Sequence, residues 1–246
     1  MNILVCISKT PDTTSKIAFT DGNTKFDENG VQFIVNPYDE WYALVRALEI
    51  KEAGGGNVTI VTVGGADTEP VIRKALAIGA DTAVRIDAPV GDPTMVAQQI
   101  AAYASGKNFD LILLGKETID YNGGAVGGML AELLDMPYVA LATKLDMEGG
   151  KAVITREVPG GSEVLEVDGP VVLSAAKGMA EQRIPNMRGI MAARTKPLDV
   201  VAAAPVEAMT RVVNYELPPA KGTCKYIDAD NAGELIRLLH EEAKVI

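Results

Sequence analysis

Residues 57–79 read NVTIVTVGGADTEPVIRKALAIG, and their pattern decides the fold class. Residues 57–63 form an apolar run rich in β-branched side chains, which favours a buried strand. The following residues, 64–68, predict a tight turn into a helix that ends at Gly79. A short strand is expected over residues 82–87. A strand, a helix and a second strand in this order indicate a parallel sheet.

The same alternation of strands and helices extends over residues 1–143. Asn36-Pro37 predicts the start of a helix, with Asn36 as its N-cap and Pro37 at the first helical position. The fold class is therefore predicted as α/β, a doubly wound, mostly parallel, Rossmann-like sheet. Further strands are expected over residues 2–8, 109–114 and 137–142, and further helices after Asp92-Pro93 and over residues 129–134.

Two other kinds of structure are expected outside this pattern. Residues 17–34 and 143–175 predict β-hairpin excursions, because glycine-rich turns interrupt them. Residues 197–227 carry few periodic signals and predict an extended arm, which a terminal helix follows from Asp230 or Asn231. We expect a nucleotide-binding α/β domain over residues 1–194 and a C-terminal arm with its helix over residues 195–246.

Composition excludes several classes of function. The net charge of −10 and the aromatic content of 5% disfavour a nucleic-acid surface. Two cysteines and one histidine give no support to a zinc site, an iron–sulfur cluster or a Ser-His-Asp triad. No apolar run reaches the length of a membrane helix, and the N-terminal residues predict a strand and not a signal peptide. A cytoplasmic location is therefore expected.

Four segments are predicted to meet beyond the carboxyl ends of the parallel strands, where open α/β sheets bind ligands. They are residues 6–9, 36–39, 63–67 and 115–127. The last segment is rich in glycine and leads into a helix, a combination that suits a phosphate group. The spacing alone leaves open whether these glycines cradle a ligand or only form a turn. Asp120, likewise, could hold a ribose hydroxyl or cap the loop.

Standard nucleotide motifs are absent. The chain has neither a G-x-G-x-x-G after a strand nor a G-x-x-x-x-G-K-[ST]. Residues 64–68 resemble the loop of ATP pyrophosphatases, but Val63 stands where the first serine of that loop is expected. An ATP-cleaving adenylylating enzyme and a homodimeric nucleotide-sensing module therefore remain alternatives.

A second candidate surface is the basic segment RIPNMRG over residues 183–189. Met187 between Arg183 and Arg188 would suit docking onto an acidic partner, because methionine adapts to irregular surfaces. A solvated loop that packs on its own subunit is the alternative.

Six segments together resemble the beta subunit of electron transfer flavoprotein. They are ILVCISKTPD (3–12), NPYDE (36–40), IRKALAIGAD (72–81), DLILLGKETID (110–120), REVPGG with PVV (156–161 and 170–172) and NMRGIMAA (186–193). The resemblance covers the length of the chain, and the ordered combination is specific.

The resemblance implies a heterodimer with a larger alpha subunit, which holds most of a redox-active FAD, and a structural AMP in the beta subunit. The sequence departs from the family pattern at Asn122 and Ala125, where Asp and Gln are frequent in the family. Backbone N–H groups of this loop can still hold the phosphate. Carried over position by position, the implied nucleotide-binding residues are Cys6, Asn36, Pro37, Tyr38, Asp39, Val63, Gly115, Lys116, Thr118, Ile119, Asp120, Asn122, Gly123, Gly124, Ala125 and Val126.

The resemblance also implies the function. The chain would be an electron-carrier subunit and not an enzyme, receiving electrons from flavin dehydrogenases and passing them to a respiratory or other acceptor. Residues 181–189 would form the docking loop for the dehydrogenases, with Met187 as its apolar anchor, and the arm from residue 195 would pack on the alpha subunit. The alternative within the family is an electron-bifurcating variant, in which a second FAD occupies the AMP site.

Overall fold

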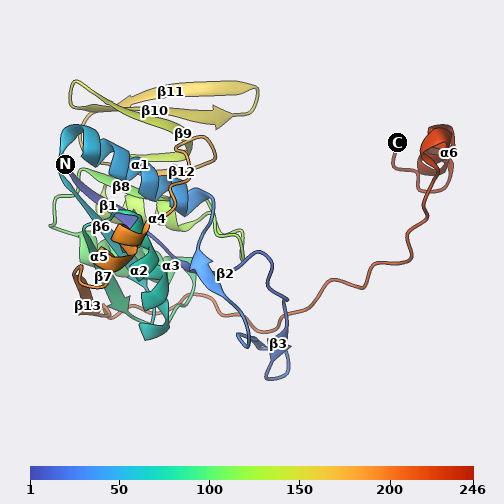
Figure 1. Cartoon of the computed structure of the whole chain (residues 1–246), viewed down its shortest axis with the longest axis horizontal. Helices are drawn as coiled ribbons and strands as arrows, with labels where there is room; N and C mark the ends of the chain where they lie inside the picture. The colour runs from blue at the N-terminus through green and yellow to red at the C-terminus, as the bar shows by residue number, and fades with distance from the viewer.

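The computed structural model describes all residues from Met1 to Ile246. Its core is a nine-stranded sheet with the order β11-β10-β9-β12-β8-β1-β6-β7-β13 (Figure 1). All neighbouring strands from β9 to β13 in this order are parallel, and β10 pairs antiparallel with β9 and β11. The strands are β1 (Asn2–Cys6), β6 (Asn57–Val63), β7 (Thr82–Asp87), β8 (Leu111–Gly115), β9 (Tyr138–Glu148), β10 (Lys151–Val158), β11 (Gly161–Val167), β12 (Val171–Ala175) and β13 (Leu198–Ala202).

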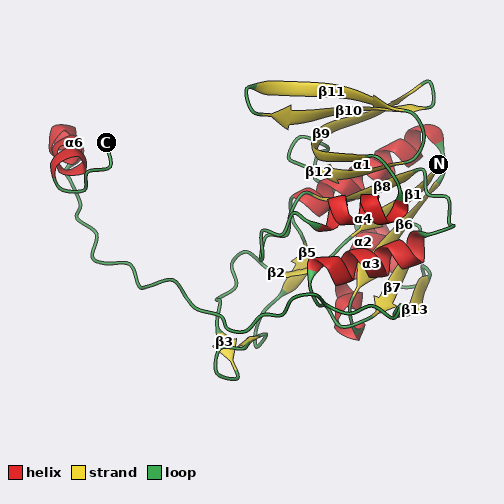
Figure 2. Ribbon diagram, turned by 180° about the vertical axis from the view of Figure 1, so that it is seen from behind, coloured by secondary structure: helices red, strands yellow, loops and turns green.

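Helices cover both faces of the sheet, as the doubly wound prediction requires (Figure 2). Side chains alternate along β1, so Ile3 and Val5 pack into the core under α1, α2 and α5, whereas Leu4 and Cys6 pack under α3 and α4. The predicted fold class is confirmed. The helices are α1 (Asp39–Gly54), α2 (Glu69–Ile78), α3 (Pro93–Ala104), α4 (Val126–Leu134), α5 (Met187–Ala193) and α6 (Ala232–Glu241), with 3-10 turns η1 (Ala66–Thr68) and η2 (Ala229–Asn231). No helix is both long enough and apolar enough to span a membrane.

The predicted excursion after β1 consists of two small antiparallel ribbons outside the main sheet (Figure 1). One pairs β2 (Lys9–Pro11) with β5 (Phe33–Val35), and the other pairs β3 (Phe19–Thr20) with β4 (Lys25–Phe26). The turn of the second ribbon has left-handed backbone at Asp21, Gly22 and Asn23, residue types that tolerate this conformation.

Three sequence-based expectations need correction, and the first two concern β12 and the start of α1. Hairpins were predicted over residues 143–175, and β9, β10 and β11 form them, but β12 is a parallel strand between β8 and β9. All five residues of β12 are buried, as a parallel strand covered on both faces should be. The N-cap of α1 is Tyr38 and not Asn36, because the Asn36 side chain donates to the Glu117 carbonyl instead, at 2.8 Å.

The C-terminal region begins inside the sheet. The sequence predicted an extended arm from about residue 195, whereas β13 pairs with β7 and forms the edge of the sheet. Beyond β13 the chain is extended, and α6 lies at its far end, well away from the other elements (Figure 1). Whether the parts on either side of residue 194 behave as separate domains stays a prediction.

Candidate functional site

The topology creates a switch point at the carboxyl end of β1. The chain passes from β1 to β6 and β7 on one side, and then returns to β8 on the other side of β1. Connections therefore leave β1 in opposite directions, and open α/β sheets generally bind ligands at the strand ends of such a switch point. The four segments predicted to meet there follow β1, β5, β6 and β8.

Specific contacts join these segments. The Asn36 side-chain amide donates to the Glu117 carbonyl at 2.8 Å, which ties the start of α1 to the loop after β8. The Lys9 ammonium pairs with Asp67 at 2.5 Å, which ties the start of β2, three residues after β1, to η1 after β6. The predicted convergence of segments far apart in sequence is thus present in the structure.

Gly115 at the end of β8 packs against Glu40 in the first turn of α1. A Cβ at Gly115 would lie 2.9 Å from Glu40 Cγ, so no larger residue fits without displacement. The Glu40 carboxylate accepts hydrogen bonds from the Ser8 backbone N–H at 2.9 Å and from the Ser8 hydroxyl at 2.6 Å. Burial raises the pKa of Glu40 to about 7, against the lowering effect of the Ser8 donors.

Backbone hydrogen bonds hold the loop from Gly115 to Val126, both within the loop and to β12. The Lys116 N–H donates to the Ala175 carbonyl at 3.0 Å, and the Asn122 N–H donates to the Thr118 carbonyl at 2.8 Å. Asp120 accepts the N–H of Tyr121 at 3.0 Å, so Asp120 caps its own loop in this structure. These hydrogen bonds therefore give the loop a defined shape, although its glycines have no side chains to pack.

The start of α4 offers donors for an anion. Its N-cap, Ala125, has no side chain that could accept a hydrogen bond from the first helical turn. The free N–H groups of that turn and the positive end of the helix dipole suit a phosphate. Gly124 passes close to the Lys116 carbonyl, because a Cβ there would lie 3.2 Å from that oxygen.

Two buried polar atoms at this edge have no hydrogen-bond partner, namely Asn36 Oδ1 and Thr118 Oγ1. Buried polar groups are nearly always paired, so an unpaired acceptor beside a ligand crevice indicates a group that a ligand satisfies. The donor-rich helix start and these unpaired oxygens fit a nucleotide, which carries both an anionic phosphate and N–H and O–H donors.

Cys6 and Asp39 are the buried ionisable members of the predicted set. Burial raises the pKa of the Cys6 thiol, and the nearby Glu40 carboxylate raises it further, so the thiol stays protonated in the core. Burial also raises the pKa of Asp39, against the attraction of Lys116. Tyr38 differs from both, because it is exposed at the rim of the site.

Sequence reasoning did not assign a role to three residues of this site, although Ser8 and Tyr121 lie within the predicted segments 6–9 and 115–127. Ser8 and Glu40 lie under the loop, and Tyr121 is exposed beside Asp120. Burial raises the pKa of Tyr121 to about 12, with a contribution from a hydrogen bond to Tyr215 of the arm. The presence of an acidic residue in the first turn of a helix is normally explained by the helix dipole. This general explanation was sufficient for Glu40 in the sequence, so its contact with Ser8 was not predicted.

The predicted docking loop leads into α5 and presents apolar side chains to solvent. Met187 is 74% exposed and Ile184 80% exposed, and Ile190 and Met191 are exposed beside them. The sequence had indicated Met187 alone. Arg183 forms a bidentate ion pair with Glu52 at 2.6 and 3.0 Å, whereas Arg188 makes no ion pair. This surface is therefore more apolar and less basic than the sequence suggested.

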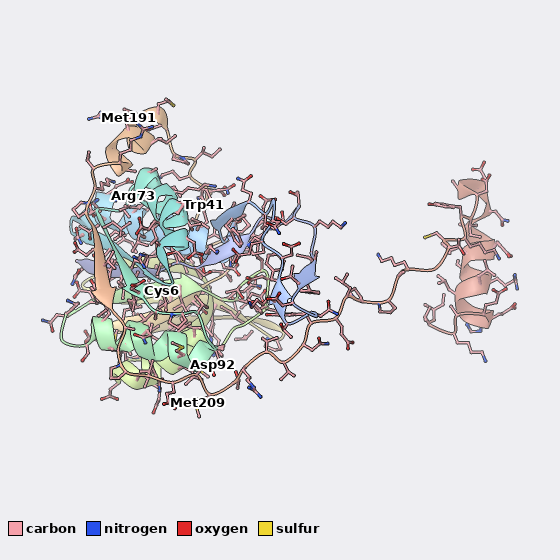
Figure 3. The ribbon with its side chains drawn as sticks, turned by 90° about the horizontal axis from the view of Figure 1, so that it is seen from below. Cys6, Trp41, Arg73, Asp92, Met191 and Met209 are labelled. Atoms are coloured by element: carbon pink, nitrogen blue, oxygen red, sulfur yellow. The ribbon has the colours of Figure 1, made fainter.

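Reciprocal capping holds α5 against α2 (Figure 3). The Arg73 guanidinium of α2 donates to the carbonyls of Ala193 and Lys196 at 2.8 and 2.7 Å, next to the carboxyl end of α5. The Lys196 ammonium donates to the carbonyls of Leu76 and Ala80 at 2.9 and 2.5 Å, where α2 ends. Gly189 permits the close packing, since a Cβ there would collide with the Ala77 carbonyl. The exposed methionines thus stand on a rigid support.

Comparison with known proteins shows one family. The electron transfer flavoprotein domain matches residues 23–206. The chain is 38% identical to the electron transfer flavoprotein subunit beta of Bacillus subtilis, over 260 aligned residues that cover all of both chains. It is 38% identical to the Syntrophomonas wolfei subunit over 90% of this chain and 87% of that one, and 30% identical to the Sus scrofa subunit over 100% and 99%. The chain therefore belongs to the electron transfer flavoprotein family, among its beta subunits.

Proposed function

We propose that this electron-carrier subunit joins a larger alpha subunit, which holds most of a FAD, and that it binds AMP as a structural ligand at the strand ends. Beta subunits of this family carry electrons and are not enzymes. A flavin, when bound, supplies the redox chemistry, and the protein supplies binding, orientation and electrostatics. The proposal includes dehydrogenases as electron donors, a respiratory or other acceptor, and the cytoplasmic location expected from the sequence.

The observation that carries the AMP site is the pairing of two complementary features in one crevice. The uncapped start of α4 offers N–H donors, and Asn36 Oδ1 and Thr118 Oγ1 are buried acceptors without partners. A phosphate suits the first feature, and the N–H and O–H donors of a nucleoside suit the second. The proposed ligand residues are those named from the resemblance, from Cys6 to Val126.

The remaining parts of the chain are assigned to partners. Tyr38 is exposed at the rim, and we assign it, with the turn at residues 10–13, to the subunit interface over the flavin. The arm and α6 are assigned to the alpha subunit, and residues 181–189 to the dehydrogenases. The exposure of Met187 and the rigid support of α5 on α2 favour the assignment of residues 181–189 to the dehydrogenases.

Substitution of Met187 tests the docking surface. Met187→Ala should lower the second-order rate of flavin reduction by a partner dehydrogenase about tenfold, because interface anchors contribute about 1–2 kcal/mol or more. Stopped-flow absorbance of the flavin measures this rate. The FAD content should be unchanged, and loss of FAD in this variant would contradict the assignment.

Nucleotide extraction tests the proposed function directly. The chain would be co-expressed and purified with its alpha subunit, and the nucleotides released by acid would be quantified by chromatography. One FAD and one AMP per heterodimer are expected. Two FAD and no AMP would mean that the site holds a second, redox-active FAD, as in an electron-bifurcating variant. Absence of both nucleotides would contradict the proposal.

A further inference from the structure

Glu40 is a buried carboxylate without a cationic partner. It is 5% exposed, and no Lys, Arg or His lies within ion-pair distance of it. The N–H and the hydroxyl of Ser8 donate hydrogen bonds to its carboxylate, and these donors are uncharged. A buried charge is costly unless it is paired, so a carboxylate in this position favours its neutral form more than an exposed carboxylate does.

The surroundings of Glu40 belong to the proposed nucleotide site. Gly115 packs against its Cγ, and the backbone N–H of Asn36 contributes a further favourable interaction with the carboxylate. The ionisable groups nearby are the Cys6 thiol at the end of β1, Asp39 on α1 and Asp120 on the loop. Lys116, the nearest cation of the loop, pairs with Glu117 at 3.1 Å. No positive charge is therefore available to hold Glu40 ionised.

We propose that Glu40 is a positioning residue whose protonation is coupled to occupation of the site: an anionic nucleotide that binds against the Ser8, Asn36 and Gly115 segments causes Glu40 to take up one proton from solvent. This inference rests on the proposed nucleotide site. The physical cause is that the bound nucleotide brings the negative charge of its phosphate to the same edge of the sheet and excludes water there, and both effects favour the neutral carboxyl. The proton adds to a carboxylate oxygen, and no other bond changes.

The sign of the pH dependence follows from this coupling. Burial and the charge of Asp120 raise the pKa of Glu40 to about 7, and a bound anion would raise this pKa further. Below about pH 7 the carboxyl is already protonated, so nucleotide affinity should be constant there. Above pH 7 the free protein loses the proton that the complex retains, and affinity should fall by up to about tenfold per pH unit.

Calorimetric titration of the full chain with AMP tests the coupling. Titrations at pH 7.0 and 8.5, in two buffers of different ionisation enthalpy, give the affinity and the number of protons taken up per AMP. The AMP phosphate has a pKa near 6, so its charge is nearly constant in this range. The wild-type chain should lose affinity about tenfold between the two pH values and should take up protons.

Three variants separate the coupling from a structural effect. Glu40→Gln keeps an acceptor for the Ser8 N–H but cannot titrate, so the affinity of this variant should change less than about twofold over the same range. Ser8→Ala removes the hydroxyl that lowers the pKa of Glu40, so the fall in affinity should begin at a higher pH. Glu49→Gln, on the same helix outside the site, should behave like the wild type.

The outcomes distinguish this inference from the function on which it rests. If AMP binds and Glu40→Gln retains the tenfold loss and the proton uptake, the site stands and the role of Glu40 is wrong. If AMP does not bind the wild-type chain at either pH, the nucleotide site and the inference both fail. A shift of the Ser8→Ala profile toward lower pH would also contradict the inference.

Discussion

Gly115 shows at the scale of one residue why the end of β8 has no side chain. A Cβ at this position would lie 2.9 Å from Glu40 Cγ and 3.1 Å from the Glu40 backbone nitrogen. The backbone of Gly115 is not left-handed, so the requirement for glycine is steric. The first turn of α1 can reach the crevice only because this volume is empty.

Gly115→Ala should therefore destabilise the chain. Insertion of a methyl group into a packed contact costs about 1–3 kcal/mol, because the backbone of α1 has to move. Urea denaturation measures the loss as a lower midpoint with an unchanged slope. The same variant should retain less AMP, since the first turn of α1 carries Glu40 and Asn36 lies just before this turn.

Gly128→Ala is the matched control. Gly128 lies within α4, and a Cβ there would meet Tyr138 at an ordinary distance of 3.6 Å. Alanine should stabilise this helix by about 0.5–1 kcal/mol, because glycine is the poorer helix former. Equal destabilisation by the two substitutions would contradict the steric explanation for Gly115.

The residues of the site differ in how well the sequence predicted them. The segments that follow β1, β6 and β8 could be predicted, because the carboxyl ends of parallel strands meet at one edge. The part played by Glu40 could not, since it depends on Ser8, 32 positions away, and on the missing side chain at Gly115. The involvement of Arg183 in an ion pair with Glu52 is equally non-local, across 131 positions.

At the scale of elements, Asp92 joins α3 to the root of the C-terminal arm (Figure 3). One carboxylate oxygen accepts the Met95 N–H at 2.8 Å and caps the helix. The other oxygen accepts the N–H groups of Met209 and Thr210, both at 2.6 Å, and the Thr210 hydroxyl at 3.2 Å. These donors lower the pKa of Asp92, so both functions depend on an ionised carboxylate.

Asp92→Asn should release the arm while it preserves the helix. The amide oxygen can still accept from Met95, and asparagine is a good N-cap. The amide nitrogen is a donor and would face the backbone N–H groups of Met209 and Thr210, so these two hydrogen bonds cannot form. Hydrogen exchange should become about tenfold or more faster at Met209 and Thr210, with α3 unchanged.

Thr210→Val provides the comparison for the arm. It removes the 3.2 Å hydroxyl contact and keeps both backbone N–H groups, so exchange at Met209 should stay slow. Slow exchange at Met209 in Asp92→Asn would show that something other than the carboxylate holds the root of the arm.

Elements with a clear local pattern could be predicted, and elements defined by a distant partner could not. The strand-helix-strand unit over residues 57–87 could be recognised from its apolar run, its turn and its helical pattern, and the structure places β6, α2 and β7 there. β12 and β13 are five residues each, and both are strands because β8, β9 or β7 supplies their hydrogen bonds. A segment of five residues has too little periodicity to distinguish a parallel strand from a hairpin arm.

At the scale of the whole molecule, the central sheet buries its apolar side chains, whereas the C-terminal helix α6 exposes some of its own. Helices cover both faces of the central parallel strands, but α6 stands apart at the end of the arm (Figures 1 and 2). Its Leu235 and Ile236 side chains are 45% and 60% exposed. The arm touches the body through Asp92 and again where Tyr215 stacks on Phe19, with ring centroids 4.8 Å apart. An amphipathic helix held away from its own core is typical of an element that packs on another subunit.

The apolar side of α6 should therefore contribute to binding of the proposed alpha subunit. Leu235→Glu with Ile236→Glu removes two apolar side chains from the interface and should weaken the heterodimer by about 3 kcal/mol or more, at least a hundredfold in Kd. Native mass spectrometry and size-exclusion chromatography of the co-expressed subunits measure the loss. Glu241→Gln, on the polar side of α6, should leave assembly intact, although it removes an ion pair with Arg237. A full yield of heterodimer from the double variant would mean that α6 does not pack on the alpha subunit, and the arm would then need another partner.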